Sequence, residues 1–119
     1  MSISPQLLAG FAAEATELLV RIAANVEQVQ LQPDLVGHLE EARRAAHQVK
    51  GAASMIGLAD LAHVFYFMED ALEELRSGRA PFDEHAASVL EACVWQLGDC
   101  LNGMLDGREP VALAEQHER

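Results

Sequence analysis

Hydrophobic residues recur along this chain at intervals of three and four, which is the spacing of one face of an α-helix. A first run begins after Ser4 and Pro5, which are typical of a helix N-cap and of the first helical position. Its apolar positions are Leu7, Phe11, Ala15, Leu18, Ile22, Val26 and Val29. The pattern predicts a long amphipathic helix that begins at Pro5 and ends near Gln30.

Three further segments repeat this pattern, and each is bounded by residues that typically start or stop a helix. The second follows Pro33 and Asp34, stops at Gly57, and has apolar positions Leu35, Leu39, Ala42, Ala46, Val49, Ala53 and Ile56. The third stops at Gly78 and has apolar positions Leu58, Leu61, Phe65, Met68, Leu72 and Leu75. The fourth, capped by Asp83 and closed by Asp106-Gly107, has Ala86, Leu90, Cys93, Leu97, Leu101 and either Met104 or Leu105.

No segment shows a run of alternating apolar and polar residues, so the sequence gives little reason to expect a sheet. Four long helices joined by short turns predict an all-α fold, an antiparallel up-down-up-down four-helix bundle. We expect residues 1–107 to form this bundle. Residues 108–119 are polar and poorly patterned, and form either a short fifth helix after Pro110 or a linker.

Composition narrows the function classes. The 119 residues fit one domain, and their formal net charge is −11 at pH 7. This charge argues against nucleic acid, which needs a basic face, and against an anionic membrane surface. An acidic excess is most often only a well-solvated surface, so the charge excludes partners without identifying one.

Hydropathy, the N-terminal residues and the cysteines indicate the cellular compartment. No apolar run reaches the roughly 20 residues needed to span a bilayer, and Met1 to Pro5 lack the features of a signal peptide. Cys93 and Cys100 would share a helix face two turns apart, too far to bridge each other. Buried free thiols are typical of a reducing compartment, so we expect a cytoplasmic protein.

A second, polar stripe runs along the second predicted helix. Its members lie at steps of three and four: Glu40, Arg43 or Arg44, His47, Lys50, Gly51 and Ser54. His47 is therefore expected at or near solvent, in the middle of the helix. Lys50, one turn away, is the only lysine in the chain. Gly51 costs about 1 kcal/mol against alanine inside a helix, so its presence calls for a reason.

Each of these residues has a role if His47 accepts a phosphoryl group. A neutral imidazole is a nucleophile near neutral pH. Lys50 would neutralise the arriving phosphoryl oxygens, and the missing side chain at Gly51 would let a partner protein approach closely. If the third helix turns Glu69 toward His47, that carboxylate would hold Nδ1–H and leave Nε2 free to attack.

Spacing and composition alone leave other interpretations open. A histidine on the polar face of a helix is most often an ordinary surface residue, as we expect of His38, His63, His85 and His117. A purely structural or docking bundle is a second interpretation, but it needs neither Lys50 nor Gly51. A metal-carboxylate bundle needs two Glu-x-x-His motifs, and the sequence contains none. We therefore expect no metal.

The run from Ala46 to Leu58, AHQVKGAASMIGL, resembles the signature of histidine-containing phosphotransfer (HPt) domains. That signature is a histidine, two residues, lysine, glycine, small residues and then an apolar–glycine pair. The lead-in at 41–46 and the stretch at 67–78 are similar to the phosphotransfer domains of chemotaxis-type histidine kinases. The resemblance extends over residues 11–105.

This resemblance implies a role for each candidate site residue. His47 matches the phosphorylated residue, Lys50 the lysine beside it, and Gly51 the glycine opposite the partner's active site. Glu69 matches the glutamate that hydrogen-bonds the imidazole. Tyr66 departs from the pattern, because chemotaxis-type relatives often carry a second histidine there. This difference puts two properties in question: how the imidazole of His47 is tuned, and which partner the domain prefers.

The resemblance also implies the partners, and it implies no bound cofactor. The phosphoryl group would come from a histidine kinase ATP-binding domain, in cis or in trans, or from a receiver aspartate. It would leave to the aspartate of a response-regulator receiver domain. The chain has no Gly-rich phosphate loop and no kinase signature, so we expect that it does not phosphorylate itself from ATP. It is either a free-standing carrier or a domain of a longer kinase.

Overall fold

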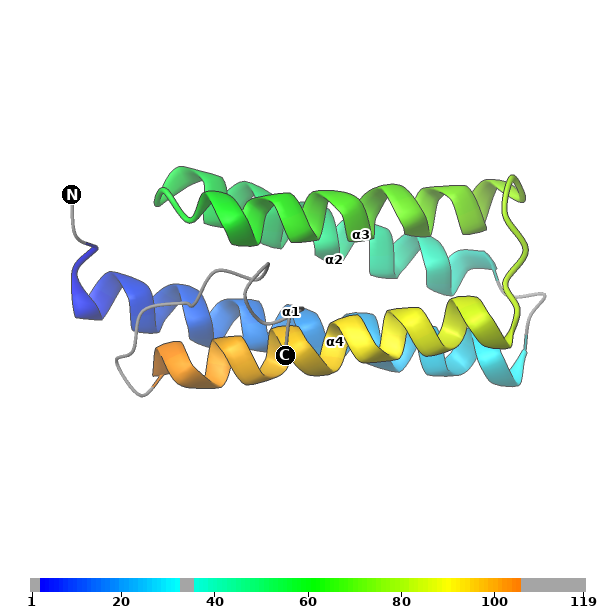
Figure 1. Cartoon of the computed structure of the whole chain (residues 1–119), viewed down its shortest axis with the longest axis horizontal. Coiled ribbons are helices and arrows are strands. Elements are labelled where there is room, and N and C mark those ends of the chain that lie inside the picture. The colour runs from blue at the N-terminus through cyan, green and yellow to red at the C-terminus, as the bar shows by residue number, and fades with distance from the viewer. Residues whose placement is uncertain (1–2, 33–35, 106–119) are drawn as a thin grey trace.

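The computed structural model of the chain describes residues 3–32 and 36–105, most of which lie in four α-helices (Figure 1). These are α1 (Pro5–Leu31), α2 (Val36–Met55), α3 (Ala59–Ser77) and α4 (Glu84–Leu105). Helix α1 packs against α2 and α4, and α2 packs against α3. Consecutive helices run in opposite directions, so the predicted antiparallel four-helix bundle is confirmed.

The described residues contain no strand, and none of their helices is long and apolar enough to cross a membrane. The predicted turn at Pro33-Asp34 lies outside these residues. So do the boundary at residue 107 and the tail 108–119 with its fifth helix or linker.

The ends of the helices follow the predicted signals. The Ser4 hydroxyl accepts a hydrogen bond from the Leu7 amide at 3.1 Å, and the Asp83 carboxylate accepts one from the Ala86 amide at 2.9 Å. Gly57 and Gly78 both have φ of +82°, a conformation that favours glycine. Gly57 lets the chain reverse between α2 and α3 within three residues, which sets these two helices side by side.

The hydrophobic core follows the predicted stripes, but Ile56, Leu75 and Cys93 are only half-buried at its edge, and Leu35 lies outside the described residues. Two further positions were predicted wrongly. Leu7 and Ala86 were expected inside, but Leu7 is 50% exposed and Ala86 half-buried, while Leu8 and Ala87 are buried in their place. Both errors lie in the first turn of a helix. There, spacings of three and of four to the next core residue fit the pattern equally well. At the end of α4, the core position belongs to Met104, which is fully buried, and not to Leu105.

The two cysteines are free thiols, as predicted, but only Cys100 is buried and Cys93 is half-buried. Burial raises the pKa of both thiols. Of the three consecutive aromatic residues of α3, Tyr66 and Phe67 are 52% and 63% exposed, and only Phe65 is buried. A helix presents one face to the bundle, and Phe65 occupies that face of α3.

One buried polar side chain fixes α1 against α2. Asn25 is 6% exposed, and its amide nitrogen donates to the Arg21 carbonyl at 2.8 Å. Its Oδ1 is therefore left to accept from His38 Nδ1, which lies 2.7 Å away. A buried amide with both ends satisfied favours one arrangement of the two helices.

Candidate functional site

His47 stands in the middle of α2 with its side chain 62% exposed. Its neighbours Ala46 and Val49 are fully buried in the hydrophobic core. The same helix turn that buries these two residues therefore directs the imidazole outward, on the side of α3. The expected position of His47, accessible and mid-helix, is where the structure places it.

The ring is oriented by a carboxylate from the neighbouring helix. His47 Nδ1 lies 2.8 Å from Glu69 Oε2, and the Glu69 side chain is only 16% exposed. Burial acts to raise the pKa of Glu69, but hydrogen bonds from Lys50 and His47 outweigh it, so the pKa lies below its ordinary value. Glu69 is thus an ionised acceptor and Nδ1 the donor. In the neutral ring, the free lone pair is on Nε2.

Lys50 holds the second oxygen of the same carboxylate. Its Nζ donates to Glu69 Oε1 at 2.7 Å and lies 5.6 Å from the centre of the Tyr66 ring. Glu69 therefore bridges His47 and Lys50, one to each oxygen. The Tyr66 ring is a second contact of the same ammonium group. The ammonium group predicted to neutralise phosphoryl oxygens is held one turn from His47, in contact with Glu69.

Arg43 is the member of the site that sequence reasoning left undecided. Its Nη1 lies 3.5 Å from Glu69 Oε2, the oxygen that also accepts from His47. Arg43 is held in turn by Glu40, at 2.8 and 2.9 Å, and by Glu73 at 3.6 Å. The pattern placed either Arg43 or Arg44 on the polar stripe. Spacing does not decide between them, because residues three apart and four apart both lie on one helix face. The contact with Glu69 of α3 identifies Arg43 as the site residue.

Around Arg43, a network of ion pairs ties α2 to α3. Arg76 contacts Glu40 at 3.2 Å and Glu73 at 2.6 Å. The hydrogen bond from Arg43 is the main cause that lowers the pKa of Glu40 to about 2. Arg44, by contrast, contacts only Glu40 within this network, and its side chain is 74% exposed. The network therefore positions Arg43 and leaves Arg44 in solvent.

Gly51 lies one turn beyond His47 on the surface of α2. A Cβ atom at this position would have no atom within 4 Å, so the packing of the bundle does not require glycine. Its cost to the helix is not offset by any contact among the described residues. The open space that it leaves belongs to the surface beside the imidazole.

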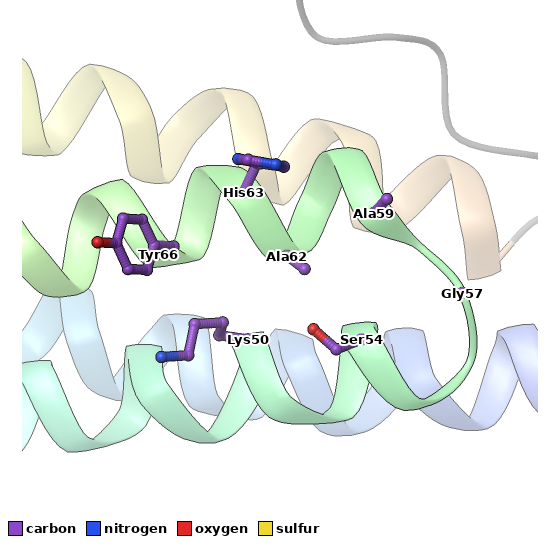
Figure 2. A pocket seen from close by; sticks show the side chains of 7 residues that line it. All are labelled: Lys50, Ser54, Gly57, Ala59, Ala62, His63 and Tyr66. Atoms are coloured by element: carbon purple, nitrogen blue, oxygen red, sulfur yellow. The ribbon is translucent and has the colours of Figure 1, made fainter.

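A shallow groove of about 450 Å³ continues from the site along the seam of α2 and α3 (Figure 2). Figure 2 shows Lys50 and Ser54 projecting from α2 across from Ala62 and Tyr66 of α3. Gly57, Ala59 and His63 complete its lining. The exposed imidazole and this groove therefore form one continuous surface of the α2–α3 pair.

The four predicted site residues thus share one surface. Glu69 contacts His47 and Lys50, whereas Gly51 contacts none of them and lies beside them on α2. Within residues 3–32 and 36–105, no three His, Cys, Asp or Glu side chains are grouped as metal ligands. The arrangement presents a nucleophilic nitrogen, an oriented proton on the other ring nitrogen and a nearby cation.

Comparison with known proteins identifies the family. The family model described as the Hpt domain matches residues 6–106. The chemotaxis protein CheA of Listeria monocytogenes is 28% identical over 102 residues, which cover 86% of this chain and 16% of that protein. The chemotaxis protein CheA of Treponema pallidum is 27% identical over 103 residues, covering 87% of this chain and 12% of that protein.

A solved structure shares the fold. The phosphorylated P1 domain of CheA3 in complex with CheY6, from R. sphaeroides, aligns with a TM-score of 0.83 and 21% identity. The alignment covers 97% of this chain and 90% of that one. The chain belongs to the Hpt domain family, the class that the bundle and the exposed histidine define. It spans about a sixth or less of the length of these curated CheA relatives.

Proposed function

We propose that this domain is a phosphorelay carrier in two-component signal transduction, with Nε2 of His47 as the covalent site. The observation that carries the proposal is the 2.8 Å contact between Nδ1 of the exposed His47 ring and the ionised Glu69. An ordinary surface histidine needs no such partner. Membership of the Hpt family supports the same role.

The chemistry follows from the tautomer. The Nε2 lone pair attacks the phosphorus of the donor, the N–P bond forms, and the bond from phosphorus to the donor's leaving oxygen breaks with its electron pair. The proton stays on Nδ1. The positive charge that develops on the ring is stabilised by Glu69. In the onward step a receiver aspartate attacks the phosphorus, and the N–P electron pair returns to Nε2.

Lys50 and Gly51 act on the phosphoryl group and on the partner, respectively. Lys50 supplies positive charge beside the position that the phosphoryl oxygens take up, and Glu69 and Tyr66 keep it there. Because Gly51 has no side chain, a partner's active site can approach this part of the helix surface to bonding distance. Since no buried contact depends on Gly51, partner access is the role we assign to it.

The partners we propose are a kinase ATP-binding domain, in cis or in trans, as donor and a response-regulator receiver as acceptor. The similarity to one segment of chemotaxis CheA proteins supports a place within a longer kinase. A cytoplasmic location follows from these partners, because ATP and receiver domains are found there. No bound cofactor is needed, because donor and acceptor are other protein domains.

Phosphoramidate, a small donor that needs no partner, tests the proposal. The domain is treated with it, and the parent is compared with His47→Gln by intact mass. His63→Gln, an exposed histidine on the neighbouring helix, serves as the matched control. We expect one acid-labile phosphoryl group on the parent and on His63→Gln, and none on His47→Gln. Equal labelling of all three, or no labelling, would instead favour a structural or docking bundle without phosphotransfer.

A further inference from the structure

The outer face of α1 and α4 exposes the only tryptophan of the chain. Figure 1 shows α1 and α4 on one side of the bundle and α2 and α3, which carry the site, on the other. On this face Trp95 of α4 is 75% exposed and Val20 of α1 is 64% exposed. Tryptophan is rarely left in water without a partner and is enriched at the centres of protein interfaces.

Two hollows flank the indole, with volumes of about 400 and 340 Å³. Both are lined by Ala23, Val94 and Trp95, so the indole forms the wall that they share. Val26 lies in the first, and Leu19 and Val20 lie in the second. Together the hollows make one apolar groove along the seam of the two helices, which we call the α1–α4 groove.

A glycine lines part of this groove. Gly98 lies inside α4 and lines the second hollow. A Cβ atom there would meet Leu19 Cδ2 at 3.7 Å, an ordinary contact, so packing between the helices does not require glycine. A glycine inside a helix reduces its stability relative to alanine. Gly98 therefore leaves the second hollow without a side chain at this position, although the bundle would accept one.

The charge around the groove indicates which kind of partner can bind there. Among residues 3–32 and 36–105, the charged residues that line it are Glu27, Glu91 and Asp99, and no lysine or arginine joins them. Glu91 also accepts a hydrogen bond from Gln30 at 2.6 Å, across from α4 to α1. A second copy of this chain would bring like charges together on this face, and an anionic membrane would be repelled by it. A basic partner is attracted.

We propose that the α1–α4 groove docks an amphipathic α-helix of a partner protein. The apolar stripe of that helix covers Trp95 and Val20, and lysine or arginine on its flanks pairs with Glu27, Glu91 and Asp99. The groove lies on α1 and α4, whereas His47 belongs to α2, which lies with α3 on the other side of the bundle in Figure 1. A helix docked there leaves the imidazole open. This consequence rests on the proposed function: the domain is bound to one protein while it exchanges phosphate with another.

The emission of Trp95 reports on the groove directly, because no other tryptophan contributes. The full chain is titrated with a synthetic 18-residue helical peptide that carries a leucine stripe flanked by lysines. A matched peptide carries glutamates in place of the lysines. We expect a saturable blue shift with the lysine peptide and at least about tenfold weaker binding of the glutamate peptide.

Calorimetry with three variants separates groove binding from attraction to an acidic surface. Trp95→Ser and Val20→Ser should each weaken binding of the lysine peptide about tenfold. Met55→Ser, which removes an apolar side chain that is 88% exposed at the end of α2, should leave it unchanged. None of these side chains is part of the core, and the phosphoramidate reaction of His47 should be the same in all three. That reaction tests the proposed function separately.

Several results would overturn the proposal. Equal affinity in Trp95→Ser would mean that charge alone attracts the peptide, and the absence of saturable binding would remove the site. Self-association of the parent in sedimentation, lost in Trp95→Ser, would make a second copy the occupant. If the fluorescence of Trp95 in the free monomer had the short emission wavelength of a buried tryptophan, the chain itself would cover the groove.

Discussion

Glu69 on α3 accepts from Nδ1 of His47 on α2 at 2.8 Å, so the reactive ring is oriented by the helix that does not carry it. The two residues are joined through the short turn at Gly57, which sets α2 and α3 side by side. The site is therefore a property of the helix pair. Substitutions on α3 should change the chemistry of His47 without touching the imidazole.

The first prediction concerns Glu69 itself. Glu69→Gln keeps an oxygen that can accept from Nδ1–H but removes the negative charge that stabilises the ring as it becomes cationic. Glu69→Ala removes both. We expect phosphoramidate labelling of His47 to slow by about tenfold in Glu69→Gln and about a hundredfold in Glu69→Ala. Rates are measured by intact mass. Equal rates in all three proteins would exclude a role for Glu69.

The second prediction separates two neighbouring arginines. Arg43 contacts Glu69 at 3.5 Å, whereas Arg44 contacts Glu40 and is largely in solvent. Arg43→Met keeps the aliphatic stem and removes the charge that helps hold Glu69. We expect a loss of a few-fold in the labelling rate of His47, with about 1 kcal/mol or less of stability lost.

Arg44→Met is the matched control, because it also removes a Glu40 partner but leaves Glu69 untouched. Its labelling rate should equal that of the parent. Equal effects of the two substitutions would mean that Arg43 acts only through the overall charge of the surface.

The third prediction concerns stability at acid pH. Arg43 lowers the folded-state pKa of Glu40 to about 2 from the ordinary 4.5. A lowered folded-state pKa adds stability that is fully present above the unfolded pKa and is lost as the pH falls through the folded one. The free energy of unfolding should therefore decrease between about pH 4.5 and pH 2. The pKa shifts of Glu69 and Glu73 have the same sign.

Urea unfolding of the parent and of Glu40→Gln at several pH values measures this contribution. Glu40→Gln should be less stable than the parent at pH 7, and the difference should shrink as the pH approaches 2. A constant difference across this range would show that the pKa of Glu40 is ordinary in the folded protein.

The fourth prediction concerns Gly51. Because a Cβ atom there meets nothing, Gly51→Ala should leave the domain as stable as the parent or up to about 1 kcal/mol more stable. Transfer from phosphorylated His47 to a receiver domain should nevertheless slow, since the added methyl group stands where the partner approaches. Phosphoramidate, a much smaller donor, should label the variant at the parent's rate.

Gly10→Ala is the control for this substitution. Gly10 also lies exposed in a helix with open space around it, but on α1. It should show the same gain in stability with no change in transfer. A similar transfer rate in both variants would remove partner access as the reason for Gly51.

The sequence was sufficient for the fold because the information lies in local patterns. Spacings of three and four, the caps at Ser4 and Asp83, and the glycines at 57 and 78 each specify a helix or its end. The errors at Leu7 and Ala86 arose in the first turns of helices, where two neighbouring positions fit the spacing equally well. Only packing against another helix decides between such positions.

The site was predictable only in part. The stripe that contains His47, Lys50 and Gly51 lies on one helix, so spacing alone placed these residues together. The contact with Glu69 depended on the rotation of α3, and the resemblance to HPt domains supplied what spacing did not. The choice between Arg43 and Arg44, and the exposure of Trp95, depend on contacts between helices that no single-helix pattern contains.

The central claim is that Glu69 holds Nδ1 of His47 and leaves Nε2 to carry the phosphoryl group. Nuclear magnetic resonance of the phosphoramidate-treated domain, with ¹⁵N-labelled histidine, tests this most directly through the coupling between phosphorus and nitrogen. We predict a coupling to Nε2 of a single histidine, absent in His47→Gln, with Nδ1 still protonated. A coupling to Nδ1, or to the ring of any other histidine, would contradict the account.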